Sequence, residues 1–374
     1  MSLYQIAGRI IADNPRTLED FKFVTINGKL VVDDPLDHMK LVKLARAYAS
    51  AVRKLLNLIW GGHSHKEATK LLYNILPNYV YLETAYKNAK AITENIRFFE
   101  EYLGKNRILA DIHRFWIASR GNKWDKGNRN IKLIPRDTYF EVLIKYPWDG
   151  SWIKARAFFG ERYVPLLREL IELAGRREEG YGVVVSFREH PRIHIQIPLW
   201  LYLKYFSTSK PRGYGLIAGF DVNSDRLNVV VIDNDGNIVA VETFWYCETV
   251  SHGFPKGKAE WIRLNALSSA LEWCRRIGAD YVVFEDLTRI RCKRFTKNHY
   301  VNRKIAKFPK KQILIHGVIK ALKLGFIVVL VNPRGTTNSV THEQIMREKG
   351  LDRHMASAYM IAYRGLKVIR NHEK

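Results

Sequence analysis

The sequence predicts an α/β domain with a mixed sheet over residues 215–374, preceded by a region of strands and helices. Two observations lead to this prediction. Three apolar strands follow one another through short turns, at Gly215–Val222, Leu227–Ile232 and Ile238–Phe244. Helices and buried strands then alternate to the end, giving the order β-β-β-α-β-α-β-α. Antiparallel neighbours followed by βα units form a mixed sheet covered by helices.

Turn signals and apolar periodicity set the boundaries of these C-terminal elements. Asn234-Asp235-Gly236 is a strong hairpin signal between the second and third strands. The later elements are a helix at Trp261–Ile277, a strand at Tyr281–Phe284, a helix at Lys310–Leu324, a strand at Phe326–Val331 and a helix at Met355–Ile369.

The residues before 215 divide into four segments. Residues 1–34 are expected to form short strands, 35–106 helices, 107–206 further strands and 207–214 a linker. Asp33-Asp34-Pro35 is a helix start, Gly61-Gly62 ends that helix, and Pro77 interrupts the helical region behind it. The later strands are predicted at Ile131–Leu133, Tyr139–Tyr146, Gly182–Phe187 and Arg192–Ile197, with one helix at Tyr163–Ala174.

The chain is strongly basic, with 61 Lys and Arg residues against 37 Asp and Glu and a formal net charge of +24. Such an excess opposes folding by self-repulsion unless a polyanion neutralises it, and nucleic-acid phosphates are the commonest one. A thermophile's charge-rich surface is the alternative, although such surfaces gain Lys and Glu together. We therefore expect a nucleic-acid-binding protein.

Cysteine usage and hydropathy indicate a cytoplasmic protein. Cys247, Cys274 and Cys292 form no Cys-x-x-Cys pair, so neither a disulfide framework nor a cysteine zinc site is expected. The sequence has no apolar stretch long enough to span a bilayer and no signal peptide. We expect no membrane partner.

Two carboxylates stand at predicted strand ends. Asp221 lies within the apolar run of the first strand and Glu285 directly follows the fourth, where an unpaired charge is costly. If these strands are neighbours, both carboxylates emerge together. With Asp352, just before the last helix, they could bind two Mg²⁺ or Mn²⁺ ions and hydrolyse a phosphodiester. His354 lies two residues after Asp352. Asp352 alone is more often a helix cap.

A basic segment, Leu287–Gln312, lies just behind Glu285. It has no acid and contains Arg289, Arg291, Lys293, Arg294, Lys297, Arg303, Lys304, Lys307, Lys310 and Lys311. Interleaved aromatic residues make it suited to phosphate contact and base stacking. A second candidate nucleic-acid contact lies in residues 119–136, with Lys123, Trp124, Lys126 and Arg129. A solvated face and a plain surface loop are the respective alternatives.

The motifs around the two carboxylates resemble those of the TnpB family, transposon-encoded RNA-guided nucleases related to type V CRISPR effectors. Gly219-Phe220-Asp221-Val222-Asn223 resembles the first RuvC motif and Val283-Phe284-Glu285-Asp286-Leu287 the second. Ala358-Tyr359-Met360-Ile361 resembles part of the last helix.

The resemblance implies an RNase H-like (RuvC) nuclease domain at 215–374. It also implies a small N-terminal β-barrel, from 1–34 and 107–206, interrupted by a helical recognition lobe at 35–106. Its further implications are two-metal hydrolysis of DNA, a guide RNA and a target DNA as partners, a prokaryotic cell and association with a mobile element.

Two features depart from the family pattern. Gly335–Leu351 has no cysteine where the family carries a zinc ribbon, so a shortened loop without zinc is expected. The usual third aspartate position falls on His354, and histidine there serves as a general base in some RuvC-like nucleases. We expect Asp352 as a metal ligand and His354 as ligand or base. The alternatives are a catalytically weak or inactive RNA-guided DNA-binding protein and a guide-independent, structure-specific nuclease.

Overall fold

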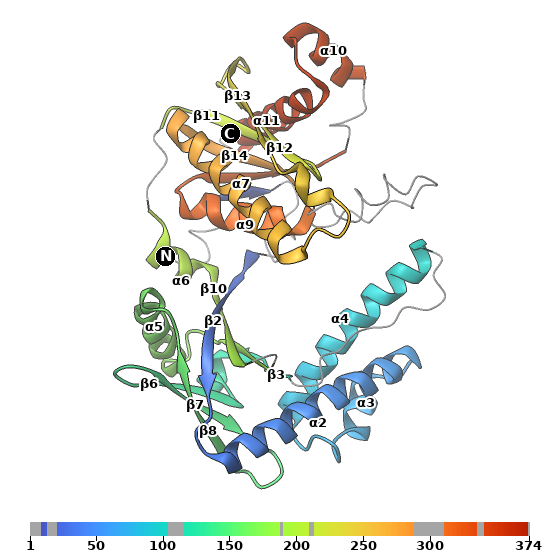
Figure 1. The fold of residues 1–374 in the computed structure, drawn as a ribbon, viewed down its shortest axis with the longest axis vertical. Coiled ribbons are helices and arrows are strands. Elements are labelled where there is room, and N and C mark those ends of the chain that lie inside the picture. Colours follow the sequence, from blue (N-terminus) through green and yellow to red (C-terminus); the bar gives the residue numbers. More distant parts are fainter. Residues whose placement is uncertain are drawn as a thin grey trace. The chain divides into compact units, whose positions relative to one another are not determined.

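The computed structural model describes residues 9–12, 21–103, 116–187, 190–208, 213–287, 310–334 and 340–372. The chain divides into two units, whose elements are labelled in Figure 1. The first unit is Met1–Lys22 with Tyr202–Lys374, and the second is Phe23–Leu201. Within the described ranges, no helix has the length and apolar character that crossing a bilayer requires.

Three helices of the second unit follow the predicted signals. They are α2 (Pro35–Trp60), α3 (His65–Leu71) and α4 (Tyr79–Leu103). Asp34 caps α2, because its carboxylate accepts hydrogen bonds from the N–H groups of Leu36 and Asp37. Tyr48 of α2 packs edge-on against Tyr81 of α4 inside this helical part.

A seven-stranded antiparallel sheet makes up most of the rest of the second unit, in the order β3-β9-β10-β2-β8-β7-β6. The strands are β2 (Phe23–Val31), β3 (Trp116–Ser119), β6 (Ile131–Pro135), β7 (Phe140–Lys145), β8 (Trp152–Phe158), β9 (Gly182–Phe187) and β10 (Pro191–Pro198). Two helices follow strands of this sheet, α5 (Val164–Gly175) and α6 (Leu199–Phe206). Strand β8 was not predicted, although its buried Ile153, Ala155 and Ala157 alternate with exposed residues in the pattern of a half-buried strand.

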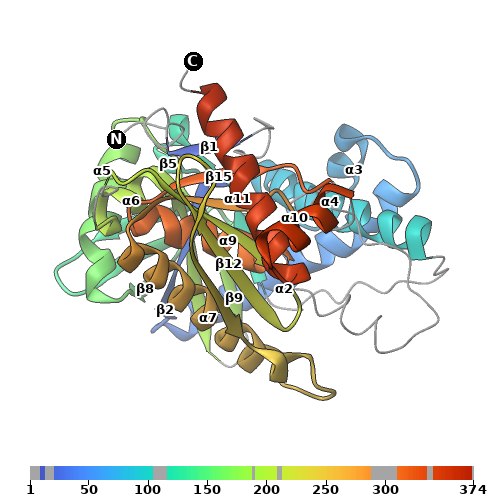
Figure 2. The same cartoon turned by 90° about the horizontal axis from the view of Figure 1, so that it is seen from above.

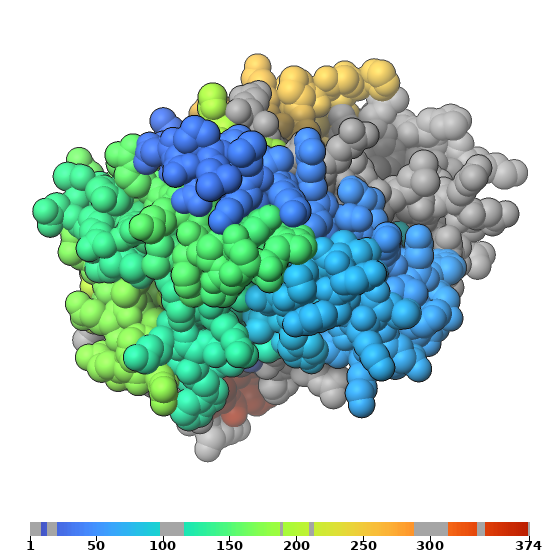
Figure 3. Space-filling model, turned by 90° about the horizontal axis from the view of Figure 1, so that it is seen from below, coloured from blue at the N-terminus to red at the C-terminus, as the bar shows by residue number. Residues whose placement is uncertain are grey.

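Helix α2 is tied to this sheet by polar contacts. Lys40 Nζ lies 3.0 Å from Asp149 Oδ2, and the N–H of Lys154 donates to Asp37 Oδ2 at 2.9 Å. Figure 3 shows the start of α2, in blue, adjoining green residues of the sheet on one surface. The helical part and the sheet therefore pack as one unit.

The outer strands of this sheet are β3 and β6. The buried side chain of Asn128 connects them: its Nδ2 donates to the Ser119 carbonyl at 3.0 Å, and its Oδ1 accepts from the Ile131 N–H at 2.9 Å. Asn128 belongs to β5 (Gly127–Asn128), which pairs with β4 (Gly121–Asn122). Among the described residues, β3 and β6 are joined through the side chain of Asn128 and not by strand pairing. The expected barrel therefore stays a prediction.

The first unit contains a six-stranded mixed sheet in the order β1-β15-β14-β11-β12-β13. Strands β11 (Leu216–Val222), β12 (Arg226–Ile232) and β13 (Ile238–Trp245) form an antiparallel meander. Strands β14 (Ala279–Glu285) and β15 (Ile327–Val331) continue the sheet on the other side of β11, parallel to it. This is the RNase H-like strand order, so the predicted fold of this part is confirmed.

Strand β1 (Ile10–Ala12) corrects the prediction for residues 1–34. We assigned those residues to the N-terminal barrel, but β1 pairs in parallel with β15, from Ile10–Val328 to Ala12–Leu330. The neighbouring Arg9 guanidinium donates to the Leu322 carbonyl at 2.8 Å. A three-residue apolar strand carries no local signal for its sheet, so only the tertiary structure assigns it.

Helices cover both faces of the mixed sheet (Figures 1 and 2). Helix α11 (Arg353–His372) packs on β11, β12, β14 and β15, where Ala358 and Leu366 join a core with Ile217 and Val283. Helix α7 (Lys256–Ile277) contacts β12, β13 and β14, and helix α9 (Lys310–Lys323) contacts β15. The Trp273 ring of α7 packs edge-on against the Phe244 ring of β13. The α11 face is therefore distinct from the α7 face.

Helix α10 (Val340–Lys349) corrects the expectation of a plain loop at Gly335–Leu351. Its buried His342 fixes it to the start of α11, with Nε2 3.0 Å from the Arg353 carbonyl oxygen and 3.2 Å from Ser357 Oγ. The start of α11 is thus held by the buried His342 of a short helix.

Gly219 allows α11 to approach β11 closely. A Cβ at this position would lie 2.3 Å from Ala358 O and 2.4 Å from Ala362 N, both backbone atoms of the helix. We expect Gly219→Ala to lower the free energy of unfolding by roughly 1–3 kcal/mol through overpacking. Gly257→Ala is the control, because nothing lies within 4 Å of that position. Equal midpoints for the two variants in chemical denaturation would contradict this account.

Candidate active site

Asp221 is the penultimate residue of β11, a strand paired on both sides. The residue is only 8% exposed. Its Oδ2 accepts from Asn223 Nδ2 at 2.7 Å and lies 3.3 Å from His354 Nδ1. These contacts compensate a carboxylate that would otherwise be costly to bury.

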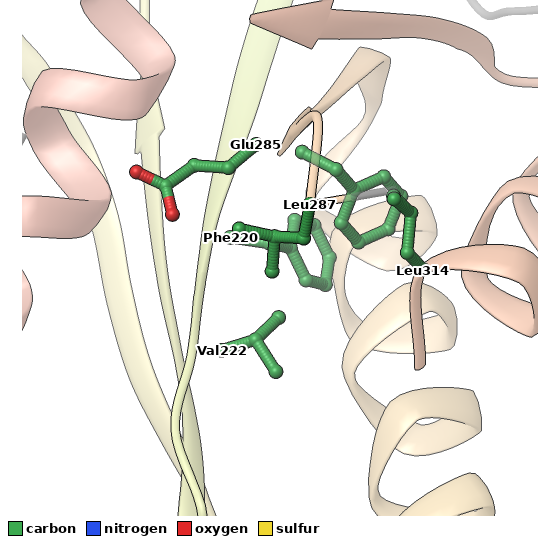
Figure 4. A pocket seen from close by; sticks show the side chains of 6 residues that line it. Phe220, Val222, Glu285, Leu287 and Leu314 are labelled. Atoms are coloured by element: carbon green, nitrogen blue, oxygen red, sulfur yellow. The ribbon is translucent and has the colours of Figure 1, made fainter. Parts of the chain in front are cut away.

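Glu285 ends β14, the parallel neighbour of β11. Phe220 and Phe284 are register partners whose ring centroids lie 4.8 Å apart on one face of the sheet. Side chains alternate along a strand, so Asp221 and Glu285 both point to the opposite face. Figure 4 shows the Glu285 carboxylate directed away from the apolar side chains of Leu287 and Leu314. The sheet therefore brings the two predicted carboxylates together at one edge, on one face.

That face is the one covered by α11. Gly219, two residues before Asp221, is the strand position in contact with the helix. His354 lies in the first turn of α11 and is thereby carried over the end of β11. The structure thus places His354, one of the predicted site residues, beside Asp221.

The contact with Asp221 orients the His354 ring. An ionised carboxylate only accepts hydrogen bonds, so Nδ1 carries the proton in this contact. In the neutral imidazole Nε2 is then the free acceptor. The His354 side chain is 36% exposed, which leaves it accessible to a substrate or to water.

Asp352 caps α11. Its Oδ1 accepts from the N–H groups of His354 and Met355, both at 2.8 Å. Both bonds stabilise the helix end that presents His354. The cap, which was the alternative to a metal-ligand role for Asp352, is thus present, and we now expect capping to be the role of this residue.

Asn228 is a site residue that sequence reasoning missed. It is the register partner of Asp221 on β12, and Thr243 is its partner on β13. Asn228 Nδ2 donates to Thr243 Oγ1 at 2.9 Å, while the buried Oδ1 has no hydrogen-bond partner among the described residues. Glu285, Asp221, Asn228 and Thr243 thus form a polar row across four strands. A lone asparagine in the apolar run Leu227–Ile232 was the available signal.

The turn after Asp221 is held rigidly. The Tyr246 hydroxyl lies 2.9 Å from the Asn223 carbonyl oxygen and 2.7 Å from that of Arg226. Burial raises the pKa of Tyr246 well above its usual range, and the nearby Asp225 and Asp221 add to the effect. The hydroxyl therefore stays protonated and remains a donor to this turn.

The polar row suits a hard divalent cation. Carboxylate and amide oxygens are the ligands that Mg²⁺ and Mn²⁺ prefer, and Asn228 Oδ1, which no other described residue engages, is a further oxygen beside Asp221. Within the described ranges, no group of three His, Cys, Asp or Glu side chains is close enough to hold a metal ion. Asp221, Glu285 and His354 therefore do not themselves form such a group in this structure, and no third carboxylate completes one in this part of the chain.

A relative from Saccharolobus solfataricus, the protein SSO2105, is 53% identical over 99% of this chain and 100% of its own length. The chain belongs to the SSO2105 family. The family model for the SSO2105 N-terminal domain matches residues 23–207, which begins where the second unit begins.

Two solved structures are similar to this SSO2105-family chain. A Cas12f1–sgRNA–target DNA complex matches 87% of the chain and 82% of its own, with 12% identity and a TM-score of 0.42. Thermus thermophilus RuvC with a Holliday junction matches 42% of the chain and 96% of its own, with 16% identity and a TM-score of 0.30.

Of the two predicted nucleic-acid contacts in this SSO2105-family chain, the structure describes one. Arg289 to Lys307 lie outside the described residues. Lys123, Trp124, Lys126 and Arg129 are all exposed, and Lys123 Nζ lies 5.1 Å from the Trp124 ring centroid. This loop follows β4 as a short 3-10 turn, Lys123–Asp125, so its Trp124 is held on an ordered surface.

The variant Asp352→Ala distinguishes a helix-capping role of Asp352 from a metal-ligand role. We expect it to lower stability by roughly 0.5–2 kcal/mol, because two N–H groups lose their acceptor. The metal concentration needed for half-maximal cleavage should stay unchanged. Thermal unfolding and a Mg²⁺ titration of cleavage measure the two effects. A large rise in the metal requirement with unchanged stability would make Asp352 a ligand.

Proposed function

We propose that this protein is a metal-dependent nuclease that hydrolyses DNA phosphodiesters at the polar row. The observation that carries the proposal is the placement of Asp221 and Glu285. They emerge side by side from two parallel strands of an RNase H-like sheet, with His354 3.3 Å from Asp221. Two carboxylates and an imidazole on one face form a donor set suited to phosphodiester hydrolysis.

Each residue has a role in this proposal. Asp221 and Glu285 would hold Mg²⁺ or Mn²⁺, which supplies electrophilic stabilisation of the phosphate when bound. His354 Nε2 would accept the proton of the attacking water, since Nδ1 is engaged by Asp221. Asp352 holds the start of α11, and Asn223 holds the Asp221 carboxylate.

We further propose that the nuclease is RNA-guided, with base pairing to target DNA supplying specificity. The support is the motif resemblance to the TnpB family and the net charge of +24, which favours polyanionic partners. The exposed Lys123 and Trp124 are candidate contacts of this kind. We expect the protein to act in the cytoplasm, where both nucleic acids are found, and in association with a mobile element.

The test begins with the RNA that copurifies with the full-length protein. Sequencing identifies it, and a DNA duplex matched to its variable part is then incubated with the complex in Mg²⁺, Mn²⁺ or EDTA. We expect cleavage only with a divalent cation, only of matched DNA, and none after RNase treatment. Cleavage of branched DNA without RNA would support a guide-independent nuclease. Failure to cleave any of these substrates in Mg²⁺ or Mn²⁺ would overturn the nuclease proposal.

A second candidate is an RNA-guided DNA-binding protein without cleavage. It is favoured by Asp352, whose Oδ1 is engaged as a helix cap and is not gathered with Asp221 and Glu285. Tight binding of matched DNA in Mg²⁺, with no cut strand after prolonged incubation, would select this function.

A further inference from the structure

The geometry points to a nucleobase-binding platform, formed by Trp245 with Arg226, beside the polar row. We propose that it stacks an unpaired base of the DNA strand whose phosphate lies at Asp221. The inference rests on the proposed function for the identity of that strand. Its own support comes from register, exposure and charge.

Strand register places the platform on the same face as the candidate site. Arg226 and Trp245 are partners across β12 and β13. They lie two residues from the pair Asn228–Thr243, which belongs to the polar row. Positions two apart on a strand share a face, and so do register partners. Trp245 is therefore on the face that carries Asp221.

Trp245 has a large exposed surface that the fold does not use. Helix α11 packs on β11, β12, β14 and β15, and Trp245 at the end of β13 is 59% exposed. The Arg226 guanidinium carbon lies 4.2 Å from the indole centroid and covers one side of the ring. Leaving so much indole in water forgoes the stabilisation that burial would give. A planar ligand on the uncovered side would recover it.

Both members of the platform are held in place. Arg226 Nε lies 3.3 Å from Asp225 Oδ1, which fixes the guanidinium over the ring. The Tyr246 N–H donates to the Asp225 carbonyl at 2.8 Å, and its hydroxyl bonds the carbonyl of Arg226. The same hydroxyl also reaches the Asn223 carbonyl, in the turn that directly follows Asp221. A rigid turn thus couples the platform to the acidic site.

The distance suits a strand that runs from the site. Two strand spacings and one side-chain repeat separate Asp221 from Trp245, which corresponds to about 12 Å between their Cα atoms. A nucleic-acid strand with a phosphate at Asp221 could place a nearby base on the indole. Bases stack on aromatic rings without sequence preference, and the adjacent guanidinium adds a cation that favours the phosphate backbone.

The test measures stacking without cleavage. Full-length protein is mixed in EDTA with single-stranded DNA oligonucleotides that carry 2-aminopurine at successive positions. We expect quenching confined to one or two positions, and its loss in Trp245→Ala. That variant should bind about 5- to 150-fold more weakly, the equivalent of ~1–3 kcal/mol. Trp245→Phe should restore most of the affinity.

Trp261→Ala is the matched control, because Trp261 is 64% exposed but lies on α7, away from the α11 face. Unchanged affinity and quenching in Trp245→Ala, or an equal loss in Trp261→Ala, would overturn the platform. Circular dichroism of each variant separates these results from misfolding. If Trp245 quenches 2-aminopurine in a protein that cleaves no DNA, the platform is supported and the nuclease proposal is wrong. If the protein cleaves DNA but Trp245 does not quench 2-aminopurine, the nuclease proposal is supported and the platform is wrong.

Discussion

Replacing Asp221 or Glu285 with alanine is expected to abolish metal-dependent DNA cleavage, while nucleic-acid binding survives. Both carboxylates lie at the ends of neighbouring parallel strands, Asp221 one residue before the end of β11, and share one face. Each removal therefore takes away a ligand of the same proposed cation site. Loss of a ligand that contributes several kcal/mol to the transition state corresponds to a rate reduction of about 10³-fold or more. Single-turnover cleavage with saturating Mg²⁺ measures the rate, and a filter-binding assay measures retention of nucleic acid.

Glu242→Gln is the matched control for these variants. Glu242 is an exposed carboxylate on β13, and its position next to Thr243 directs it to the face opposite the polar row. It should cleave at the rate of the intact protein. Cleavage by both alanine variants within tenfold of the intact protein would disprove the assignment of the site.

His354→Ala is expected to lower the cleavage rate by about 10²–10⁴-fold, with the Mg²⁺ requirement nearly unchanged. The reason is the orientation of the ring: Nδ1 contacts Asp221 Oδ2 at 3.3 Å, which leaves Nε2 to accept a proton from water. Single-turnover rates across a Mg²⁺ titration report the rate and the metal requirement separately.

The competing role for His354 is that of a metal ligand. In that case His354→Ala would need much more Mg²⁺, and His354→Asp would cleave well, because a carboxylate can take over ligation. The Asp352→Ala variant completes the comparison, since it removes only the cap of α11. A His354→Ala protein that cleaves at the normal rate would remove this residue from the mechanism.

Much of the fold could be predicted because the signals are local. The hairpin between β12 and β13 follows from Asn234-Asp235-Gly236, whose glycine adopts a φ of 85°. Apolar strands between helices fixed the order of β14 and β15. By contrast, α10 is rich in charged residues and was missed, and β8 was missed despite its regular alternation. Local periodicity fails where an element exposes much of its surface.

The candidate site was predictable in type but only partly in membership. Asp221 and Glu285 could be selected from the sequence as candidates because an unpaired carboxylate inside or directly after an apolar strand is costly to bury. Asn228 and Trp245 are separated from the motifs along the chain and join the site only through strand register. Asp352 illustrates the opposite case, since its spacing to His354 fits both a ligand and a cap.

The sequence by itself determined most of the strands and helices and singled out the two acidic positions, because periodicity and turn chemistry act between near neighbours in the chain. Tertiary structure alone decided that β1 joins the mixed sheet, that Glu285 lies beside Asp221, and that His354 reaches the Asp221 carboxylate. These arrangements depend on parallel pairing and helix docking between distant segments. No local pattern encodes such contacts, since the same apolar strand satisfies its hydrogen bonds equally well against several neighbours.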